Sequence, residues 1–212
     1  MADAEPIFEV RAVGPLRCNA YLLGCRRTHR GLIIDPGDEA EVLLERARAL
    51  GLGIEALVHT HTHLDHVSAS RRVAEEFRAP ILIHEEDLTL YRMLPEQRQM
   101  FGLPRGDDPR PPDRFLEDGE ELRVGDLTLR VIHTPGHTLG SVCLQMGDRL
   151  FSGDTLFRGS IGRTDLGGTS PGGLVRSIKS KLYPLDDDTL VLPGHGERTT
   201  LGEEKTSNPF LR

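Results

Sequence analysis

The chain has 212 residues, of which 37% are hydrophobic and 28% charged, and its formal net charge is −7 at pH 7. This balance is typical of one globular domain over residues 1–212 and excludes a chain that is disordered throughout. The acidic charge argues against a nucleic-acid surface, no apolar run is long enough to span a membrane, and the acidic N-terminus lacks a signal-peptide pattern, so we expect a cytoplasmic protein.

The first half of the chain predicts strands alternating with helices. Short apolar runs predict strands at 7–13, 20–24, 32–35, 54–58 and 81–83. Apolar residues at helical spacing predict a helix over 39–50 and another over 68–77, with Ser68 as the N-cap of the second. Residues 92–115 hold Pro104, Pro109, Pro111 and Pro112, so we expect a surface loop there with about one helical turn.

The second half repeats this order. Strands are predicted at 127–132, 142–145, 150–152 and 189–192, with a helix over 173–182. Strands mixed with helices in two similar halves predict an α/β protein with layered sheets.

Three histidines and one aspartate crowd the six positions that follow the strand at 54–58. Alternate residues of an extended segment share a side, so His61 and His63 can bind one ion together. Where the chain turns into the next helix, Asp65 and His66 can face a second ion. Imidazole and carboxylate suit Zn²⁺ or Fe²⁺. The three cysteines of the chain lack CxxC spacing, which argues against a cysteine-based zinc site.

Three further motifs lie in glycine-containing turns that each follow a predicted strand. They are TPGHT at 134–138, SGDT at 152–155 and PGHG at 193–196. Glycine lets the backbone turn tightly and can bring a ligand to the end of a strand. A loop of solvated histidines at 61–66 would leave these three motifs unexplained.

In this order, THTHLDH, TPGHT, SGDT and PGHG resemble the metallo-β-lactamase superfamily, and the likeness covers nearly the whole chain. Within it, NAYLL, IIDPGDE, GDTLFRGSIGRTD and TLGEEKTSNPFL are similar to the short-form glyoxalase II-like (hydroxyacylglutathione hydrolase-like) metallo-hydrolases. The resemblance implies a four-layer αββα sandwich with metals at one edge between the sheets. The lactamase branch often uses a cysteine ligand, and no cysteine lies in these motifs, which argues against that branch.

The resemblance also implies a ligand set for two divalent transition metal ions per chain. Zinc is expected, with iron or manganese as alternatives. The first ion would be held by His61, His63 and His137, the second by Asp65, His66 and His195, and Asp154 would bridge the two.

The activity implied is thioester hydrolysis of glyoxalase II type, which converts S-lactoylglutathione to lactate and glutathione by a hydroxide bridging the metals. Asp65, which would orient the hydroxide, and Asp154 are the expected catalytic carboxylates. Two alternatives stay open. GRTD at 162–165 also resembles persulfide dioxygenases, which would use one iron on His61, His137 and Asp154. The other alternative is hydrolysis of another ester, a lactone or a phosphodiester.

The expected partner is a small-molecule thioester, and the sequence does not indicate an oligomeric state. Arg163 is the candidate contact for a substrate anion, although it is equally well explained as a surface residue of a glycine-rich loop. Only 17 residues follow His195, so we do not expect the helical substrate domain of full-length glyoxalase II. Residues 92–115 are a possible cover for the site instead.

Four other residues near the motifs have less specific interpretations. His59, His84 and His133 are expected to form local hydrogen bonds rather than to bind metal. Asp35 in IIDPGD is either a turn former or the carboxylate partner of a ligand histidine, which is a common arrangement in metal sites.

Overall fold

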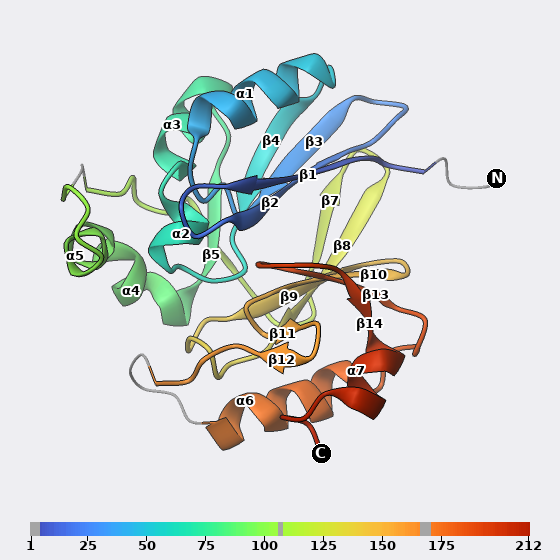
Figure 1. Ribbon diagram of the computed structural model, residues 1–212. Helices are drawn as coiled ribbons and strands as arrows, with labels where there is room; N and C mark the ends of the chain where they lie inside the picture. Colours follow the sequence, from blue (N-terminus) through green and yellow to red (C-terminus); the bar gives the residue numbers. More distant parts are fainter. Residues whose placement is uncertain (1–4, 106–107, 166–170) are drawn as a thin grey trace.

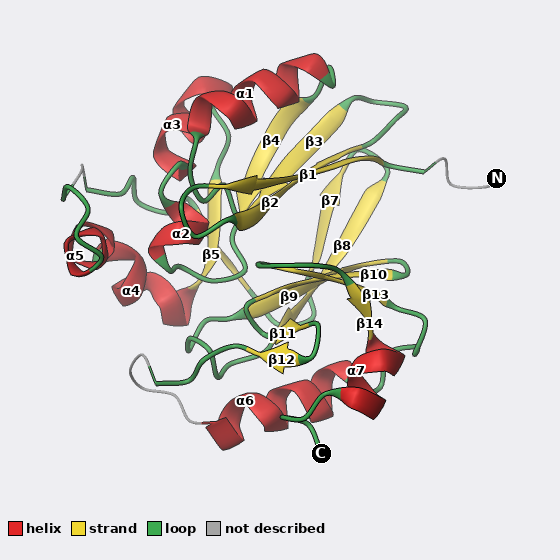
Figure 2. Ribbon diagram, in the orientation of Figure 1, coloured by secondary structure: helices red, strands yellow, loops and turns green. Residues whose placement is uncertain are grey.

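The computed structural model describes residues 5–105, 108–165 and 171–212, in which two six-stranded sheets lie face to face (Figures 1 and 2). The first sheet has the order β1 (Ile7–Val13), β2 (Cys18–Gly24), β3 (Arg30–Ile34), β4 (Gly53–Val58), β5 (Ile81–His84), β6 (Arg114–Leu116). The second has the order β14 (Thr199–Thr200), β13 (Leu190–Pro193), β10 (Arg149–Gly153), β9 (Val142–Met146), β8 (Leu127–His133), β7 (Glu121–Val124). A hairpin of β11 (Leu156–Phe157) and β12 (Ser160–Ile161) follows β10.

Helices cover the outer face of each sheet (Figure 2). The first sheet is covered by α1 (Ala40–Ala49) and α3 (Ser70–Phe77), with α2 (Leu64–Val67), α4 (Leu88–Arg92) and α5 (Leu94–Met100) at one side. The second is covered by α6 (Pro171–Ser177), which continues as a π-helical turn over Ile178–Leu182, and by α7 (Leu201–Ser207). The predicted αββα sandwich is confirmed.

Three apolar layers hold this sandwich together. Leu43 of α1 and Val73 of α3 pack on the first sheet, Leu32 and Phe151 meet between the sheets, and Leu174 of α6 lies in the layer beneath the second sheet. Burial of such aliphatic surface is the main favourable term in folding. Among the described residues, no helix is long and apolar enough to cross a membrane.

Two local predictions are wrong. The helix predicted over 68–77 is present as α3, but Ser68 does not cap it, because Ser68 ends α2 and its hydroxyl donates to the Leu64 carbonyl (2.6 Å). The segment 92–115, expected to be a loop with about one helical turn, holds the seven-residue helix α5 and the start of β6. Pro95 lies in the first turn of α5, where a helix has no need of its missing N–H, so this proline is compatible with a helix.

Candidate metal centre

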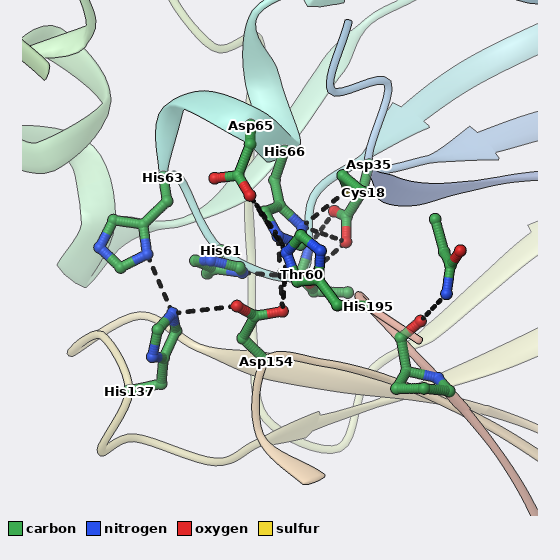
Figure 3. A network of polar contacts seen from close by, with 12 residues as sticks. Cys18, Asp35, Thr60, His61, His63, Asp65, His66, His137, Asp154 and His195 are labelled. Atoms are coloured by element: carbon green, nitrogen blue, oxygen red, sulfur yellow. Dashed lines mark hydrogen bonds and ion pairs between the residues drawn. The ribbon is translucent and has the colours of Figure 1, made fainter. Parts of the chain in front are cut away.

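The seven candidate ligands come from both sheets and meet at one edge between them (Figure 3). His61 and His63 follow β4, and Asp65 and His66 lie in α2. The other three follow strands of the second sheet, with His137 after β8, Asp154 after β10 and His195 after β13. Because β8, β10 and β13 run in the same direction, their carboxyl ends deliver these side chains to the same place.

The side chains form two adjoining clusters. In the first, ligand atoms of His61, His63 and His137 lie within 4.8 Å of one another, and His63 Nδ1 is 2.9 Å from His137 Nε2. In the second, His195 Nε2 lies 3.1 Å from Asp65 Oδ2 and 3.3 Å from His66 Nε2. The donor atoms of each cluster are therefore close enough to share one ion.

Asp154 lies between the two clusters. Its Oδ2 is 3.5 Å from His137 Nε2 and its Oδ1 is 3.4 Å from His66 Nε2. Gly194 permits this placement, because a Cβ there would lie 2.4 Å from Asp154 Oδ1. One carboxylate oxygen thus faces each cluster, as expected of a bridging ligand.

Buried polar atoms in the centre show that the residues fit a cation. His61 Nε2 and Asp154 Oδ1 are buried and have no hydrogen-bond partner in the part of the chain that the structure describes. Buried polar atoms without partners are costly, and a divalent ion would satisfy both. Imidazole and carboxylate donors suit zinc, iron and manganese alike.

A family model described as the metallo-β-lactamase superfamily matches residues 13–195. The chain belongs to this superfamily of metallo-hydrolases. Hydroxyacylglutathione hydrolase GloC of Haemophilus influenzae is 44% identical over 182 residues, which cover 84% of this chain and 86% of that protein. Probable metallo-hydrolase YqgX of Bacillus subtilis is 37% identical over 203 residues, 94% of each chain.

Solved structures of superfamily proteins match along nearly the whole chain. The BLEG-1 B3 metallo-β-lactamase has a TM-score of 0.89 at 37% identity and covers 97% of this chain and 99% of its own. TTHA1623 in a di-iron-bound form has a TM-score of 0.86 at 41% identity, and the match covers 98% of this chain and 100% of its own. ETHE1 from Myxococcus xanthus has a TM-score of 0.81 at 30% identity, and the match covers 96% of this chain and 83% of its own. One of these matches is named a B3 metallo-β-lactamase, so structural similarity alone does not separate this chain from the lactamases.

The protonation of the superfamily centre follows from burial and from its carboxylates. Burial and the neighbouring imidazoles lower the pKa of His61 far below its ordinary value and that of His63 to about 3, so both rings are neutral donors at pH 7. Burial also lowers the pKa of His66, but Cys18 and the carboxylates of Asp154, Asp65 and Asp35 outweigh this effect and raise it. His61 and His63 of the first cluster are thus neutral, whereas carboxylates gather around His66 of the second.

Hydrogen bonds behind the ligands fix their orientation. Asp35 Oδ2 accepts from His66 Nδ1 (3.0 Å) and from the Thr60 hydroxyl (2.6 Å), so of its two interpretations the carboxylate partner is the one the structure shows. His137 Nδ1 donates to the Arg163 carbonyl (2.8 Å). In both rings the opposite nitrogen, Nε2, is left to face the centre.

The histidines expected to form local hydrogen bonds lie outside the clusters. His59 bridges the Leu82 carbonyl and the Ser70 hydroxyl, at 3.1 and 2.6 Å. His84 and His133 stack at 4.0 Å between ring centroids, and His133 Nε2 donates to a loop carbonyl. These local roles agree with the prediction.

The sequence did not reveal which residues hold the turn that carries His195. Asn19 Nδ2 and the Tyr21 hydroxyl both donate to the Pro193 carbonyl, at 2.9 and 2.6 Å. Cys18 lies beside them, with its sulfur 3.5 Å from His66 Nδ1, and burial raises the pKa of its thiol to about 12, so it is uncharged. Asn19 and Tyr21 both belong to the NAYLL motif, but only the fold shows that β2 lies against the 193–196 turn.

Proposed function

We propose that the chain hydrolyses thioesters as glyoxalase II does, with S-lactoylglutathione as the substrate and lactate and glutathione as products. The observation that carries the proposal is the complete second cluster of Asp65, His66 and His195, with Asp154 between the clusters. A centre with a single metal has no need of these donors. The 44% identity to a hydroxyacylglutathione hydrolase supports the same reaction.

The residues of the centre have distinct roles in this reaction. Two bound divalent ions supply a water of lowered pKa and stabilise charge that develops on the acyl oxygen. Asp65, whose side chain is only 17% exposed, is held by His195 and can orient the attacking water. The leaving thiolate has a pKa of about 8.5, so no separate general acid is needed.

A cavity of about 210 Å³ adjoins Asp65 and offers room for the rest of the substrate. Leu16 of the β1–β2 turn and Phe101 after α5 give it apolar walls, and Arg98 of α5 adds a positive charge. Arg98, Phe101 and Leu103, which belong to the segment 92–115, therefore form one wall of the cavity beside Asp65. An apolar wall with one cation suits an acyl thioester that carries a carboxylate.

Persulfide dioxygenation is the second candidate, because ETHE1 from Myxococcus xanthus is similar along 96% of the chain. His61, His137 and Asp154, the set that a single iron would use, are among the clustered residues. The two candidates differ in metal count and in oxygen use.

Metal analysis combined with two assays separates these functions. We expect about two metals per chain, release of glutathione from S-lactoylglutathione, and no oxygen consumption with glutathione persulfide. Zinc, iron and manganese reconstitutions of the metal-free chain identify the active metal. Full activity at one iron per chain, together with oxygen consumption, would assign the dioxygenase reaction instead.

Arg163→Ala is expected to raise KM for S-lactoylglutathione by roughly 5- to 30-fold, or about 1–2 kcal/mol, with a smaller change in kcat. The Arg163 guanidinium is exposed and holds Asp165 through two hydrogen bonds, of 2.8 and 2.9 Å. An exposed ion pair of this kind is weak, so a substrate carboxylate can replace Asp165. The substitution leaves the Arg163 carbonyl in place to orient His137.

Asp165→Ala is the matched control, because it frees Arg163 from its carboxylate partner. This variant should bind the anionic thioester as well as the parent chain or better. Steady-state kinetics on both variants measure the two effects. An unchanged KM in Arg163→Ala would leave Arg163 a surface residue with no role in binding.

A further inference from the structure

Asp87 is a buried carboxylate outside both ligand clusters, and its side chain is directed at the loops that carry the first one. It ends the 3₁₀ turn Glu85–Asp87 and directly precedes α4, at a position where aspartate commonly caps a helix. Its carboxylate makes no capping hydrogen bond to α4, and the residue is 1% exposed. Helix capping therefore does not explain this side chain.

The hydrogen bonds of Asp87 connect two loops that are far apart in the sequence. Oδ2 accepts from the Thr62 N–H (3.0 Å) and from the Thr138 hydroxyl (3.0 Å), and Oδ1 accepts from the Gly140 N–H (2.7 Å). Thr62 stands between His61 and His63, and Thr138 directly follows His137. One carboxylate thus ties together the two loops that provide all three donors of the first cluster.

The packing around Asp87 leaves little freedom. A Cβ at Gly140 would lie 2.7 Å from Asp87 Cγ, so the second loop lies directly against the carboxylate. Burial raises the pKa of Asp87, whereas the hydrogen bonds from Gly140, Thr138 and Thr62 act in the opposite direction. A group so enclosed fixes the separation of the loops rather than adapting to it.

We propose that Asp87 is a positioning residue for the first metal, and that its carboxylate sets the distance between the His61–His63 loop and His137 and so the metal affinity of that cluster. Asp35 plays the corresponding part for the second cluster through His66. Asp35 also accepts from the Thr60 N–H beside His61 (2.7 Å), so it reaches both clusters, whereas the hydrogen bonds of Asp87 go to the loops of the first. This inference concerns metal affinity, so it holds or fails independently of the proposed substrate.

The test measures the Zn²⁺ affinity of each cluster separately, on metal-free chains in competition with a chromophoric chelator. Asp65→Ala disables the second cluster and leaves the first, whereas His63→Ala does the reverse. Adding Asp87→Asn should weaken Zn²⁺ binding by about 10- to 100-fold in the Asp65→Ala chain. In the His63→Ala chain the affinity should change by no more than about twofold, as for independent sites.

Asp113→Asn is the matched control, because Asp113 also accepts a main-chain N–H, from Ile81 at 2.8 Å, but lies outside the two clusters. It should leave Zn²⁺ affinity unchanged in both backgrounds. Equal weakening by Asp87→Asn in the two backgrounds, or no weakening in the Asp65→Ala chain, would overturn the proposal.

A second pair of variants tests the proposal if Asp87→Asn does not fold. Thr138→Val removes one hydrogen bond to Asp87, and Thr138→Ser keeps the hydroxyl. In the Asp65→Ala chain, valine should weaken Zn²⁺ binding and serine should restore it. Parent-like affinity in both variants would show that the link through Asp87 does not set the metal site.

Discussion

Asp154→Ala is expected to remove at least one bound metal and to lower kcat by about 10³-fold or more, since a metal supplies several kcal/mol of transition-state stabilisation and each 1.4 kcal/mol is worth about tenfold in rate. The reason is geometric. Asp154 reaches His137 with one oxygen and His66 with the other, so both clusters lose a donor. Asp65→Ala should remove less metal and lower kcat less, because Asp65 belongs only to the cluster with His66 and His195.

Metal content after dialysis and kcat for S-lactoylglutathione are the two measurements. Asp188→Ala, which removes an exposed carboxylate and changes the net charge equally, serves as the control and should change neither. Greater loss of metal and of kcat in Asp65→Ala than in Asp154→Ala would show that the bridging role is wrongly assigned.

Sequence patterns predict an element best where the burial of its own residues decides whether it forms a helix or a strand. The apolar run at 54–58 predicts β4 because a buried strand must be apolar, and the spacing of leucines and alanines over 39–50 predicts α1 because one helix face is buried. The order of the four motifs then places their residues at the ends of strands. These patterns predict an α/β protein with layered sheets, whereas the superfamily and its αββα sandwich follow from the resemblance of the four motifs to that family.

Residues whose roles depend on partners far along the chain could not be predicted in this way. Asp35 had two equal interpretations until its distance to His66 was known. No sequence pattern points to Asp87, because its partner Thr138 is 51 residues away. The prolines of the segment 92–115 favour a loop, and the full length of α5 does not show in the sequence because Pro95 fits a helix only in its first turn. Hydrogen bonds between residues so far apart in the sequence follow from the topology of the sheets.

Removal of the metals is expected to lower the melting temperature of the chain by about 8–16 °C. The clusters join the two sheets, since His61, His63, Asp65 and His66 come from the first and the other donors from the second. Ions bound only by the folded state stabilise it by about 4 kcal/mol at a free concentration of a thousand times Kd. For a chain of this size each kcal/mol shifts the melting temperature by roughly 2–4 °C.

Thermal unfolding of the loaded and the metal-free chain measures this shift, and metal analysis confirms removal. The difference in melting temperature should become smaller as the pH falls below neutrality, because protons compete with the metal for imidazole nitrogens. His66 contributes to this competition, since the carboxylates around it raise its pKa in the metal-free chain. Asp154→Ala should melt near the metal-free temperature with or without chelator. If the parent chain melts at the same temperature before and after verified metal removal, the centre does not hold the two sheets together, and the unpartnered His61 Nε2 and Asp154 Oδ1 must be satisfied in another way.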